Sequence, residues 1–435
     1  MKKILCLTWI FLALGPPRAP NSLHALDIGE GFYGSLSGIY NADGNAGLTA
    51  FPVLLIPMGG RAEGMGTAFT AVADDLTFIE WNPAASSRLA NTELGFFHNN
   101  WIADTKVEGI VYASRLENLE NFGYGASAKW LYTPFSEYNM YGDRVSKGYY
   151  SEVVATVNVS YNFLAGYYFS GISLGANLKG AFRFMPDFTD ADDRGNNQGQ
   201  IISGSGRSQS AVTAMLDLGL LTRFNLFKTF SSREKNASVA LVARNLGLAA
   251  KQEPLPASIT AALAYRPIRP LVLDFDFTVP VNTQDLGLSE KPYWAFGANL
   301  NVTDFISMRA GLLGRYGAYR VTIGSAVDLG QISLDLNYSL DLLTQITPLN
   351  RISLGVRFNF GDRGRQEKSD RVDALYLSGM DSYKAGNVDQ AKTYWEEALA
   401  INPRFDPAKE GLTLLAESSV LDNLILDSQT LDSYE

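Results

Sequence analysis

The chain has 435 residues, enough for more than one domain, with 19% charged residues, 12% aromatic residues and 40 glycines. Its formal net charge of −9 argues against nucleic-acid binding. Beyond a short apolar N-terminal stretch, no run of about 18 or more apolar residues follows, which excludes a bundle of membrane-spanning helices. Many aromatic residues, many glycines and few charges favour a β-rich chain with one face toward lipid.

Residues 1–25 have the pattern of a secretory signal peptide. Lys2 and Lys3 form the positive start, an apolar core follows, and a cleavage site lies after Ala25. The alternative is a retained membrane anchor, which the short apolar run disfavours. Cys6 lies too early in the chain for a lipoprotein cleavage site. Cleavage would move the formal net charge from −9 to about −12.

Cleavage also leaves few side chains for chemistry. Cys6 is the only cysteine, so disulfides and thiol chemistry are excluded in the mature chain. His24 would be removed as well, which leaves His98 as the only histidine. One histidine argues against a histidine-based metal site. We therefore predict no metal, no cofactor and no catalytic residue, and a protein that is not an enzyme.

Residues 26–90 are rich in Gly, Ala and Pro and show no strand periodicity. The centre of this segment, residues 59–84, reads GGRAEGMGTAFTAVADDLTFIEWNPA. A barrel follows it in the sequence, and a barrel of about fourteen strands would have an open channel unless something filled it. We therefore predict that this segment folds inside the barrel, with glycines for close packing and a turn at Asn82 and Pro83.

Residues 91–360 alternate apolar and polar side chains with a period of two, which indicates β-strands. In the clearest of these, Val157 and Val159 fall on one face and Asn158 and Ser160 on the other. The apolar faces are large and recur in nearly every segment, which favours an outward lipid face and a polar lumen. The alternative is a soluble β-sandwich whose apolar faces form the core.

We predict an all-β fold with fourteen antiparallel strands that close into a transmembrane barrel. Connections after even-numbered strands are mostly short and those after odd-numbered strands are longer, as in bacterial outer-membrane barrels. The predicted strands are 91–101, 107–114, 122–133, 151–163, 167–184, 209–224, 236–248, 258–268, 271–282, 292–303, 305–315, 318–330, 332–342 and 350–360.

After the barrel, the composition changes sharply. A charged linker (361–370), a helical segment (371–418) and an acidic tail (419–435) follow. The helical segment matches the 34-residue tetratricopeptide pattern. The matching residues are Leu375, Gly379, Gly386, Ala391, Trp395, Ala398 and Pro403. Because Phe360 would end the last strand on the periplasmic side, we expect this small α-helical domain in the periplasm, bound to a protein partner.

Some weaker patterns point to ligands. Asp190 and Asp192, within residues 187–197, fit part of a calcium-binding loop, but Arg194 and Ile201 occupy ligand positions. A solvated outer loop is therefore favoured over a calcium site.

His98, with Asn99 and Asn100, could belong to a Ser-His-Asn arrangement, but nothing in the sequence identifies the serine. Trp101 and Trp130 are predicted to lie in an interfacial girdle. Four aspartates that face the predicted lumen are expected to pair with arginines and not to act in catalysis. These are Asp274, Asp276, Asp335 and Asp341, with Arg309, Arg320 and Arg357 as partners.

The stretch GGRAEGMGTAFTAVADD…WNPAA resembles the N-terminal hatch of the long-chain fatty acid transporter family of outer-membrane proteins. The family's Asn-Pro-Ala element corresponds to Asn82, Pro83 and Ala84. The strand count and the order of hatch and barrel agree with the family. The opening is also similar to that of the barrel proteins of type IX secretion. The helical C-terminus departs from the known transporters and resembles an uncharacterised spirochaetal branch.

The resemblance implies an outer-membrane protein that takes up a hydrophobic small molecule, such as a long-chain fatty acid, by passive diffusion. In the family, the ligand enters from outside, meets the hatch and leaves sideways through the barrel wall. Asn82, Pro83 and Ala84 would then belong to the gate. The alternative is a secretion or scaffold component that binds proteins through its periplasmic repeat domain. A polar lining with no apolar pocket beneath the hatch would favour that alternative.

Overall fold

The structure is a computed structural model that describes residues 43–417 except 103, 117–118, 120, 139–140, 185–188, 191–199, 202–209, 316–317 and 343–349. The predicted signal peptide (1–25) and the acidic tail (419–435) lie outside the described residues. So do residues 26–42 and most of the candidate calcium loop.

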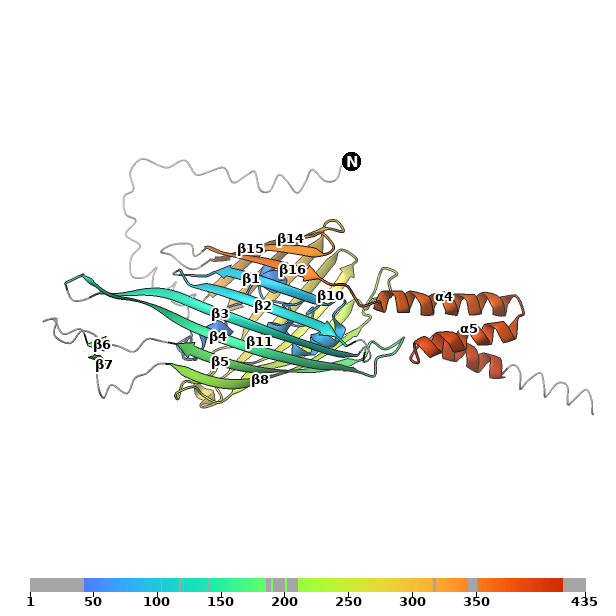
Figure 1. The fold of residues 1–435 in the computed structure, drawn as a ribbon, viewed down its shortest axis with the longest axis horizontal. Helices are drawn as coiled ribbons and strands as arrows, with labels where there is room; N and C mark the ends of the chain where they lie inside the picture. Colours follow the sequence, from blue (N-terminus) through green and yellow to red (C-terminus); the bar gives the residue numbers. More distant parts are fainter. Residues whose placement is uncertain are drawn as a thin grey trace, which may run out of the picture. The chain divides into compact units, whose positions relative to one another are not determined.

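Fourteen antiparallel strands close into one barrel (Figure 1). Consecutive strands are neighbours, and β1 closes the ring against β16, from Glu93↔Asn359 to Asn100↔Ile352. The predicted strand number and barrel are confirmed, and the β-sandwich alternative is wrong. The strands are β1 (Glu93–Asn100), β2 (Lys106–Arg115), β3 (Phe122–Tyr138), β4 (Arg144–Phe163), β5 (Ile172–Phe184), β8 (Ala211–Phe224), β9 (Ala237–Gly247), β10 (Ala257–Ile268), β11 (Leu271–Val281), β12 (Tyr293–Asn301), β13 (Ile306–Arg315), β14 (Ala318–Asp328), β15 (Ile332–Asp341) and β16 (Asn350–Asn359). Two short strands, β6 (Thr189–Asp190) and β7 (Gln200–Ile201), pair with each other outside the barrel sheet.

The barrel wall is apolar outside and polar inside. On β4, Val157 is 60% exposed, whereas its neighbour Asn158 is fully buried. On β11, Phe275 is exposed and Asp274 is buried. This is the alternation that the period-two pattern predicts, because successive side chains of a strand point to opposite faces.

The connection between β3 and β4 differs from the prediction. The sequence predicts strands that end near 133 and begin near 151, whereas the strands reach Tyr138 and begin at Arg144. Cross-strand pairs continue along this extension, for example Ser136↔Lys147. The segment is rich in Tyr and also contains Phe135 and Val145, residue types that favour extended backbone. Gly142, with a φ of 85°, lies in the tight connection.

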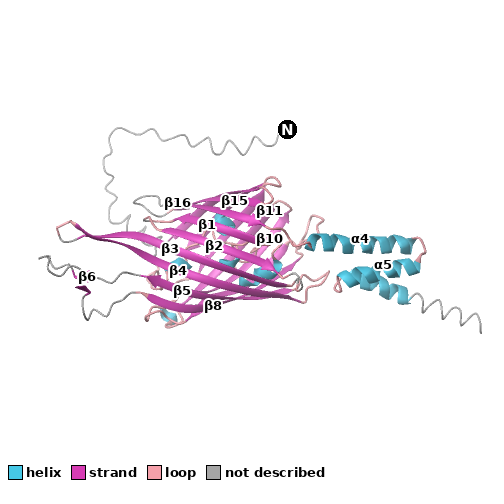
Figure 2. Cartoon of the chain, viewed as in Figure 1, coloured by secondary structure: helices cyan, strands magenta, loops and turns pink. Residues whose placement is uncertain are grey.

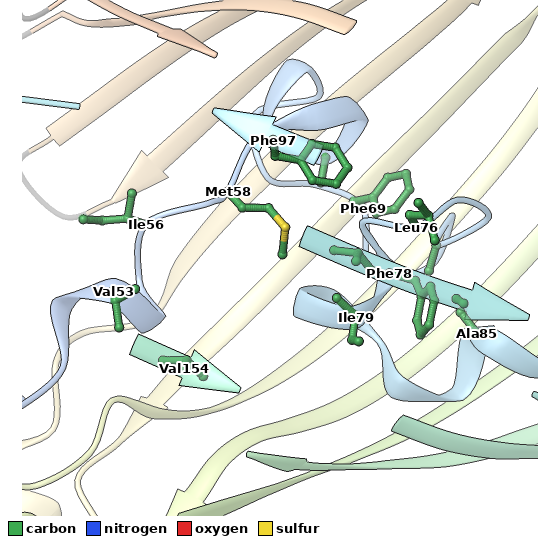
Figure 3. Close-up of a cluster of buried hydrophobic side chains, with 14 of the residues drawn as sticks. Val53, Ile56, Met58, Phe69, Leu76, Phe78, Ile79, Ala85, Phe97 and Val154 are labelled. Atoms are coloured by element: carbon green, nitrogen blue, oxygen red, sulfur yellow. The ribbon is translucent and has the colours of Figure 1, made fainter. Parts of the chain in front are cut away.

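Residues 50–90, which we call the luminal segment, pack inside the barrel (Figure 2). They contain η1 (Pro52–Leu54), α2 (Gly60–Gly64), α3 (Phe78–Trp81) and η2 (Pro83–Arg88). Figure 3 shows part of their core, in which Phe69 lies near Phe97 of the wall and Val53 lies near Val154 of the wall. The luminal segment thus builds its hydrophobic core jointly with inward-facing barrel residues.

Glycines on the strands let the luminal segment approach the wall. A Cβ on Gly311 of β13 would fall within contact distance of the Gly66 backbone, and one on Gly175 of β5 would meet Pro83 and Ala84. Since no side chain separates these backbones, the luminal segment lies directly against the wall.

The C-terminal part is helical, as predicted. Helix α4 (Arg365–Lys384) and helix α5 (Val388–Ile401) precede a further helical segment at 406–417. Because α4 begins at Arg365, most of the predicted linker 361–370 is helical. Within residues 43–417, apart from the gaps given above, no helix is both long enough and apolar enough to cross a membrane.

The two helices pack through residues that the repeat pattern selects. Trp395 is 2% exposed, and Gly379 leaves the space that its indole ring occupies. Ala391 and Ala398 are fully buried beside it. Helix α4 ends before Gly386, whose φ is 82°, as is common just after a helix C-terminus. The assignment to the tetratricopeptide family stays a prediction.

Replacing Gly311 with alanine should loosen the luminal segment while leaving the barrel closed. The added Cβ would push against the Gly66 backbone, and such overpacking costs about 1–3 kcal/mol. Limited trypsin digestion of the purified protein should then cut faster at Arg61 and Arg88, with closure of the barrel checked by its mobility on gels before and after heating.

Gly180→Ala is the matched control, since a Cβ at this exposed glycine of β5 would meet nothing within 4 Å. Equal cutting of the two variants would contradict the tight packing at Gly311.

Candidate functional site

Asn82, Pro83 and Ala84 form a buried anchor of the luminal segment. The Asn82 side chain donates from Nδ2 to the Thr70 carbonyl (2.9 Å) and accepts at Oδ1 from the Ala84 amide (3.0 Å). The second bond caps the helical turn that begins at Pro83. The Pro83 carbonyl accepts from Nδ2 of Asn158 on β4 (2.9 Å). These three residues therefore tie two parts of the luminal segment to each other and to the wall.

Asp274 and Asp276 on β11 form a second anchor. Asp276 Oδ2 accepts from the Thr70 amide (3.2 Å) and the Phe69 amide (3.3 Å), and Asp274 Oδ2 accepts from the Val72 amide (3.2 Å). The expected pairing with arginine is wrong for both aspartates within the described part of the chain. The irregular backbone of the luminal segment has amides that no strand satisfies, and these carboxylates accept from them.

Asp335 and Asp341 do pair with arginines, as predicted. Asp335 Oδ1 lies 2.5 Å from Arg309 and its Oδ2 lies 3.0 Å from Arg357. Asp341 bridges Arg320 (2.8 Å) and Arg351. The pair of Arg309 and Asp335 reaches from β13 to β15 across β14, and the other pairs join neighbouring strands. All lie on the inner face, where they neutralise buried charge.

Glu63 of α2 is a third anchor, and it is 2% exposed. Its carboxylate accepts from Asn99 Nδ2 on β1 (3.2 Å) and from Ser339 Oγ on β15 (3.4 Å). Burial raises the pKa of the Glu63 carboxyl above its usual value of 4.5, and hydrogen bonds from serines together with the distant Arg320 oppose the rise.

A cavity of about 350 Å³ lies between the luminal segment and one end of the barrel wall. The lining includes residues beside the 282–292 connection and at the start of the luminal segment, so the cavity lies at the end with most of the long connections. Much of its lining is apolar. The main apolar residues are Leu54, Leu55, Ile56, Met58, Ile79, Trp81, Val154 and Leu313.

Five cations from the wall line the same cavity, and Arg315 and Arg320 pair there with Glu290 and Asp341. Lys129 of β3 pairs with Glu80, and Lys179 of β5 lies 2.6 Å from Asp217. Arg244 of β9 stacks over the ring of Trp81 at 5.1 Å and donates to Thr260 Oγ1 at 3.1 Å. Among the described residues Arg244 forms no ion pair within 4 Å, although its charge also acts on the buried carboxylate of Asp276, and its side chain lines the cavity.

Asn82, Pro83 and Ala84 do not line this cavity. They follow α3 directly in the chain, and Ile79, Glu80 and Trp81 of α3 do line the cavity. The motif that the sequence singles out is thus one turn away from the space that a ligand could occupy.

The two tryptophans have different surroundings. Trp130 is 46% exposed on the outer face and lies 4.7 Å from the Tyr132 ring, which agrees with an outward position. Trp101 lines the cavity, with Arg351 3.6 Å and Arg320 5.1 Å from its ring. The prediction of a girdle position is therefore wrong for Trp101, because a cation pair on the inner face draws its ring inward.

His98 does not assemble a catalytic group with Asn99. Successive residues of β1 point to opposite faces, and His98 Nδ1 lies 2.9 Å from Glu108 Oε1, whereas Asn99 is fully buried on the inner side. In the described part of the chain, no three His, Cys, Asp or Glu side chains are grouped as a metal site.

Residues 37–363 match the family model described as "Uncharacterised protein family (UPF0164)". The chain belongs to the UPF0164 family. A UPF0164 protein of Treponema pallidum (strain Nichols) is 31% identical, over 84% of this chain and 82% of its own length. Another from the same organism is 27% identical, over 86% of this chain and 76% of its own length. The relatives come from a spirochaete, as the resemblance implies.

Solved barrels are similar at a lower level. A Pseudomonas aeruginosa FadL homologue aligns with 11% identity and a TM-score of 0.41, over 69% of this chain and 97% of its own. A deletion mutant of the monoaromatic hydrocarbon channel TodX aligns with 14% identity and a TM-score of 0.40, over 64% and 93%. Identities and scores this low say nothing of substrate.

Sequence reasoning missed the cavity and its cations. Lys129, Lys179 and Arg244 each stand at an inward position of a strand, where a costly buried charge would have been the signal. The sequence does not indicate which part of the irregular luminal segment faces each of these three side chains.

Replacing Glu63 with glutamine should remove one pH-dependent part of the protein's stability. Because the folded pKa of Glu63 is raised, its stabilising contribution is complete below about 4.5 and is lost as pH rises through the folded value. The Tm of the natural protein minus that of Glu63→Gln should therefore fall as pH increases from 4.5 toward neutrality.

Glu396→Gln, at an exposed position of α5, controls for the loss of a carboxylate elsewhere. A Tm difference between Glu63→Gln and the natural protein that stays constant with pH would contradict this assignment.

Proposed function

We propose that this protein is an outer-membrane barrel that lets hydrophobic, anionic small molecules diffuse across the membrane, with long-chain fatty acids as the leading class. The luminal segment is its gate, and its role is not enzymatic. The observation that carries the proposal is the cavity of about 350 Å³, which combines an apolar lining with Lys129, Lys179 and Arg244.

The outer surface supports a membrane location. Exposed apolar side chains occur on strand after strand, including Val157, Phe277, Ile323 and Leu354. A contiguous apolar surface of this extent is rare on proteins in water and is the normal exterior of a membrane barrel. The inner face supports the same assignment of an apolar exterior and a polar lumen, since its charged side chains are buried and mostly form ion pairs.

The chemistry of the cavity supports an amphiphile with an acidic head. Leu54, Leu55 and Ile56 provide a surface for an acyl chain, and Arg244 has no carboxylate partner among the described residues. Ligand pockets of this size are lined mainly by apolar groups with a few polar groups that fix orientation. A neutral or cationic ligand would leave the Arg244 charge unmatched.

The position of the luminal segment supports a role as a gate. It fills the lumen, and between residues 50 and 90 only non-covalent contacts hold it to the wall. Passage requires some of its anchors to open, and Thr70 is held by two of them, since its hydroxyl donates to Asp276 and its carbonyl accepts from Asn82. We assign Asn82, Pro83 and Ala84 to the gate as anchors that hold α3 against the cavity, and not as ligand contacts.

A second candidate function is a secretion or scaffold role through the C-terminal helices. Leu377 of α4 and Leu414 of the following helical segment are 61% and 60% exposed. Exposed leucines on a small helical unit favour a protein partner. The apolar cavity favours transport as the main role, with partner binding as an addition in the periplasm.

Purified protein in liposomes should carry radiolabelled oleate inward in a saturable way. Leu55→Asp should slow this uptake by about tenfold or more, because a carboxylate at an apolar, 43% exposed position of the cavity lining would repel both parts of the ligand. Initial rates at several oleate concentrations measure the effect.

Leu329→Asp is the matched control, because this exposed leucine lies in the β14–β15 turn and not in the cavity lining. A variant with both Asn82→Ala and Pro83→Ala tests the gate and should change the rate in either direction. No uptake by a closed, heat-modifiable barrel would reject the transport proposal and favour the scaffold role.

The C-terminal helices should resist trypsin added to intact cells and be cut once the outer membrane is permeabilised. Lys384 and Lys392, at exposed positions, are suitable cleavage sites. An antibody against α5 reports the loss of the fragment, and a periplasmic marker protein controls for leakage. Cutting on intact cells would reject the periplasmic location.

A further inference from the structure

A second cavity, of about 430 Å³, lies where the luminal segment meets the connections β4–β5 and β8–β9. Its lining includes Val72, Asp74 and Arg88 of the luminal segment, together with Ser170 and Arg223 of the wall. These connections are at the end of the barrel from which the chain continues into α4. Under the proposed orientation, this cavity is the periplasmic vestibule.

The vestibule is rich in positive charge. Two lining residues are acidic, Asp74 and Glu234, and both are already engaged, with Arg61 (2.6 Å) and Arg266 (2.6 Å) respectively. The cationic lining residues are Arg88, Arg223, Arg233, Lys235 and Arg266. The cations therefore outnumber the carboxylates that could neutralise them.

Arg88 and Arg223 stand out within this group. Neither forms an ion pair with a carboxylate among the residues that the structure describes. Arg88 donates to the Ser170 carbonyl (3.0 Å) and to Ser170 Oγ, and Arg223 donates to the Val72 carbonyl (3.1 Å), so each uses only part of its five donors. Both side chains are at least partly buried.

The charge of Arg223 disfavours the charge of Arg88, whereas the carboxylates of Asp74 and Glu234 attract Arg223. Burial, together with the nearby charges of Arg223 and Arg115, lowers the pKa of Arg88 to about 9. An arrangement that holds two like charges together in a cavity is unfavourable when empty and becomes favourable when an anion lies between them.

We propose that Arg88 and Arg223 form a binding site for an oxyanion, the carboxylate or phosphate group of an amphiphile or of a free anion. Guanidinium forks bind the two oxygens of such a group with paired hydrogen bonds. The site joins a residue of the luminal segment to a residue of the wall, so a bound anion fastens one to the other.

One role for this site rests on the function proposed above. The acidic head of a molecule that has passed the first cavity would be held at the periplasmic end before release. A lipid phosphate or inorganic phosphate offers the same chemistry, and the experiment must separate these sources.

The test measures the Tm of the purified full-length mature protein in a non-ionic detergent at constant ionic strength. Oleate, its uncharged methyl ester, inorganic phosphate and chloride are titrated separately. Arg88→Gln and Arg223→Gln are compared with Arg269→Gln, an exposed arginine in the β10–β11 turn at the same end and outside the lining.

We expect oleate or phosphate, but neither methyl oleate nor chloride, to raise the Tm of the natural protein and of Arg269→Gln. The anion concentration at half-effect should rise by about tenfold or more in Arg88→Gln and Arg223→Gln, because a charged hydrogen-bond partner is lost. Without anion, Arg88→Gln should be at least as stable as the natural protein, since the repulsion is relieved.

Stabilisation by oleate alone supports a site for the head group of the transported molecule. Stabilisation by phosphate supports an oxyanion site for a lipid head group or free phosphate. The proposal is overturned if no anion exceeds chloride, or if Arg223→Gln lowers the Tm equally with and without anion while the half-effect concentration is unchanged, as a purely structural role requires.

The liposome assay separates this inference from the function beneath it. Oleate uptake without anion stabilisation would reject the site and leave transport intact. Anion stabilisation that depends on Arg88 and Arg223, in a protein that moves no oleate, would reject transport and leave the site intact.

Discussion

The structure depends on the mutual satisfaction of buried hydrogen-bonding groups between the barrel wall and the luminal segment. A closed barrel of fourteen strands is too wide for its own side chains to fill. An irregular segment inside it has backbone groups that no strand pairs. Asn177 and Asn337 of the wall donate to the carbonyls of Ile79 (2.9 Å) and Gly60 (2.8 Å), while Asp276 accepts from amides. Without these hydrogen bonds, the buried polar groups of both the wall and the luminal segment would be left unsatisfied.

The same interdependence connects stability with the proposed function. A gate must be held firmly enough to keep the lumen closed and loosely enough to move within the lifetime of a transport event. Hydrogen bonds from single wall residues, such as Asn158 to Pro83, are suited to this because each can open without unravelling a strand. The cavities at the two ends then differ in chemistry. The first is largely apolar and contains Arg244, and the second contains the two arginines Arg88 and Arg223.

Much of the wall could be predicted because each strand records its environment in a period of two. Val157 and Asn158 show which face is which without knowledge of any neighbour. The contacts of the lumen have no such period. Asp335 could be matched to arginines on nearby strands, but the partners of Asp274 and Asp276 are backbone amides, which every sequence has. Trp101 was misplaced for the same reason, since the arginines that stack on it come from β14 and β16.

The pairing of β1 with β16 has a consequence for how the molecule assembles. Thr92 and Phe360 border this seam, and the backbone of Thr92 bonds to Gly361 (2.9 Å) and to Phe360 (2.9 Å). The seam joins the first strand made to the last, so it is the strand pairing of longest sequence separation and the slowest strand pairing to form by chance encounter. The luminal segment is synthesised before either strand. It must therefore be enclosed as the cylinder shuts, and its compaction and the closing of the seam are one kinetic event.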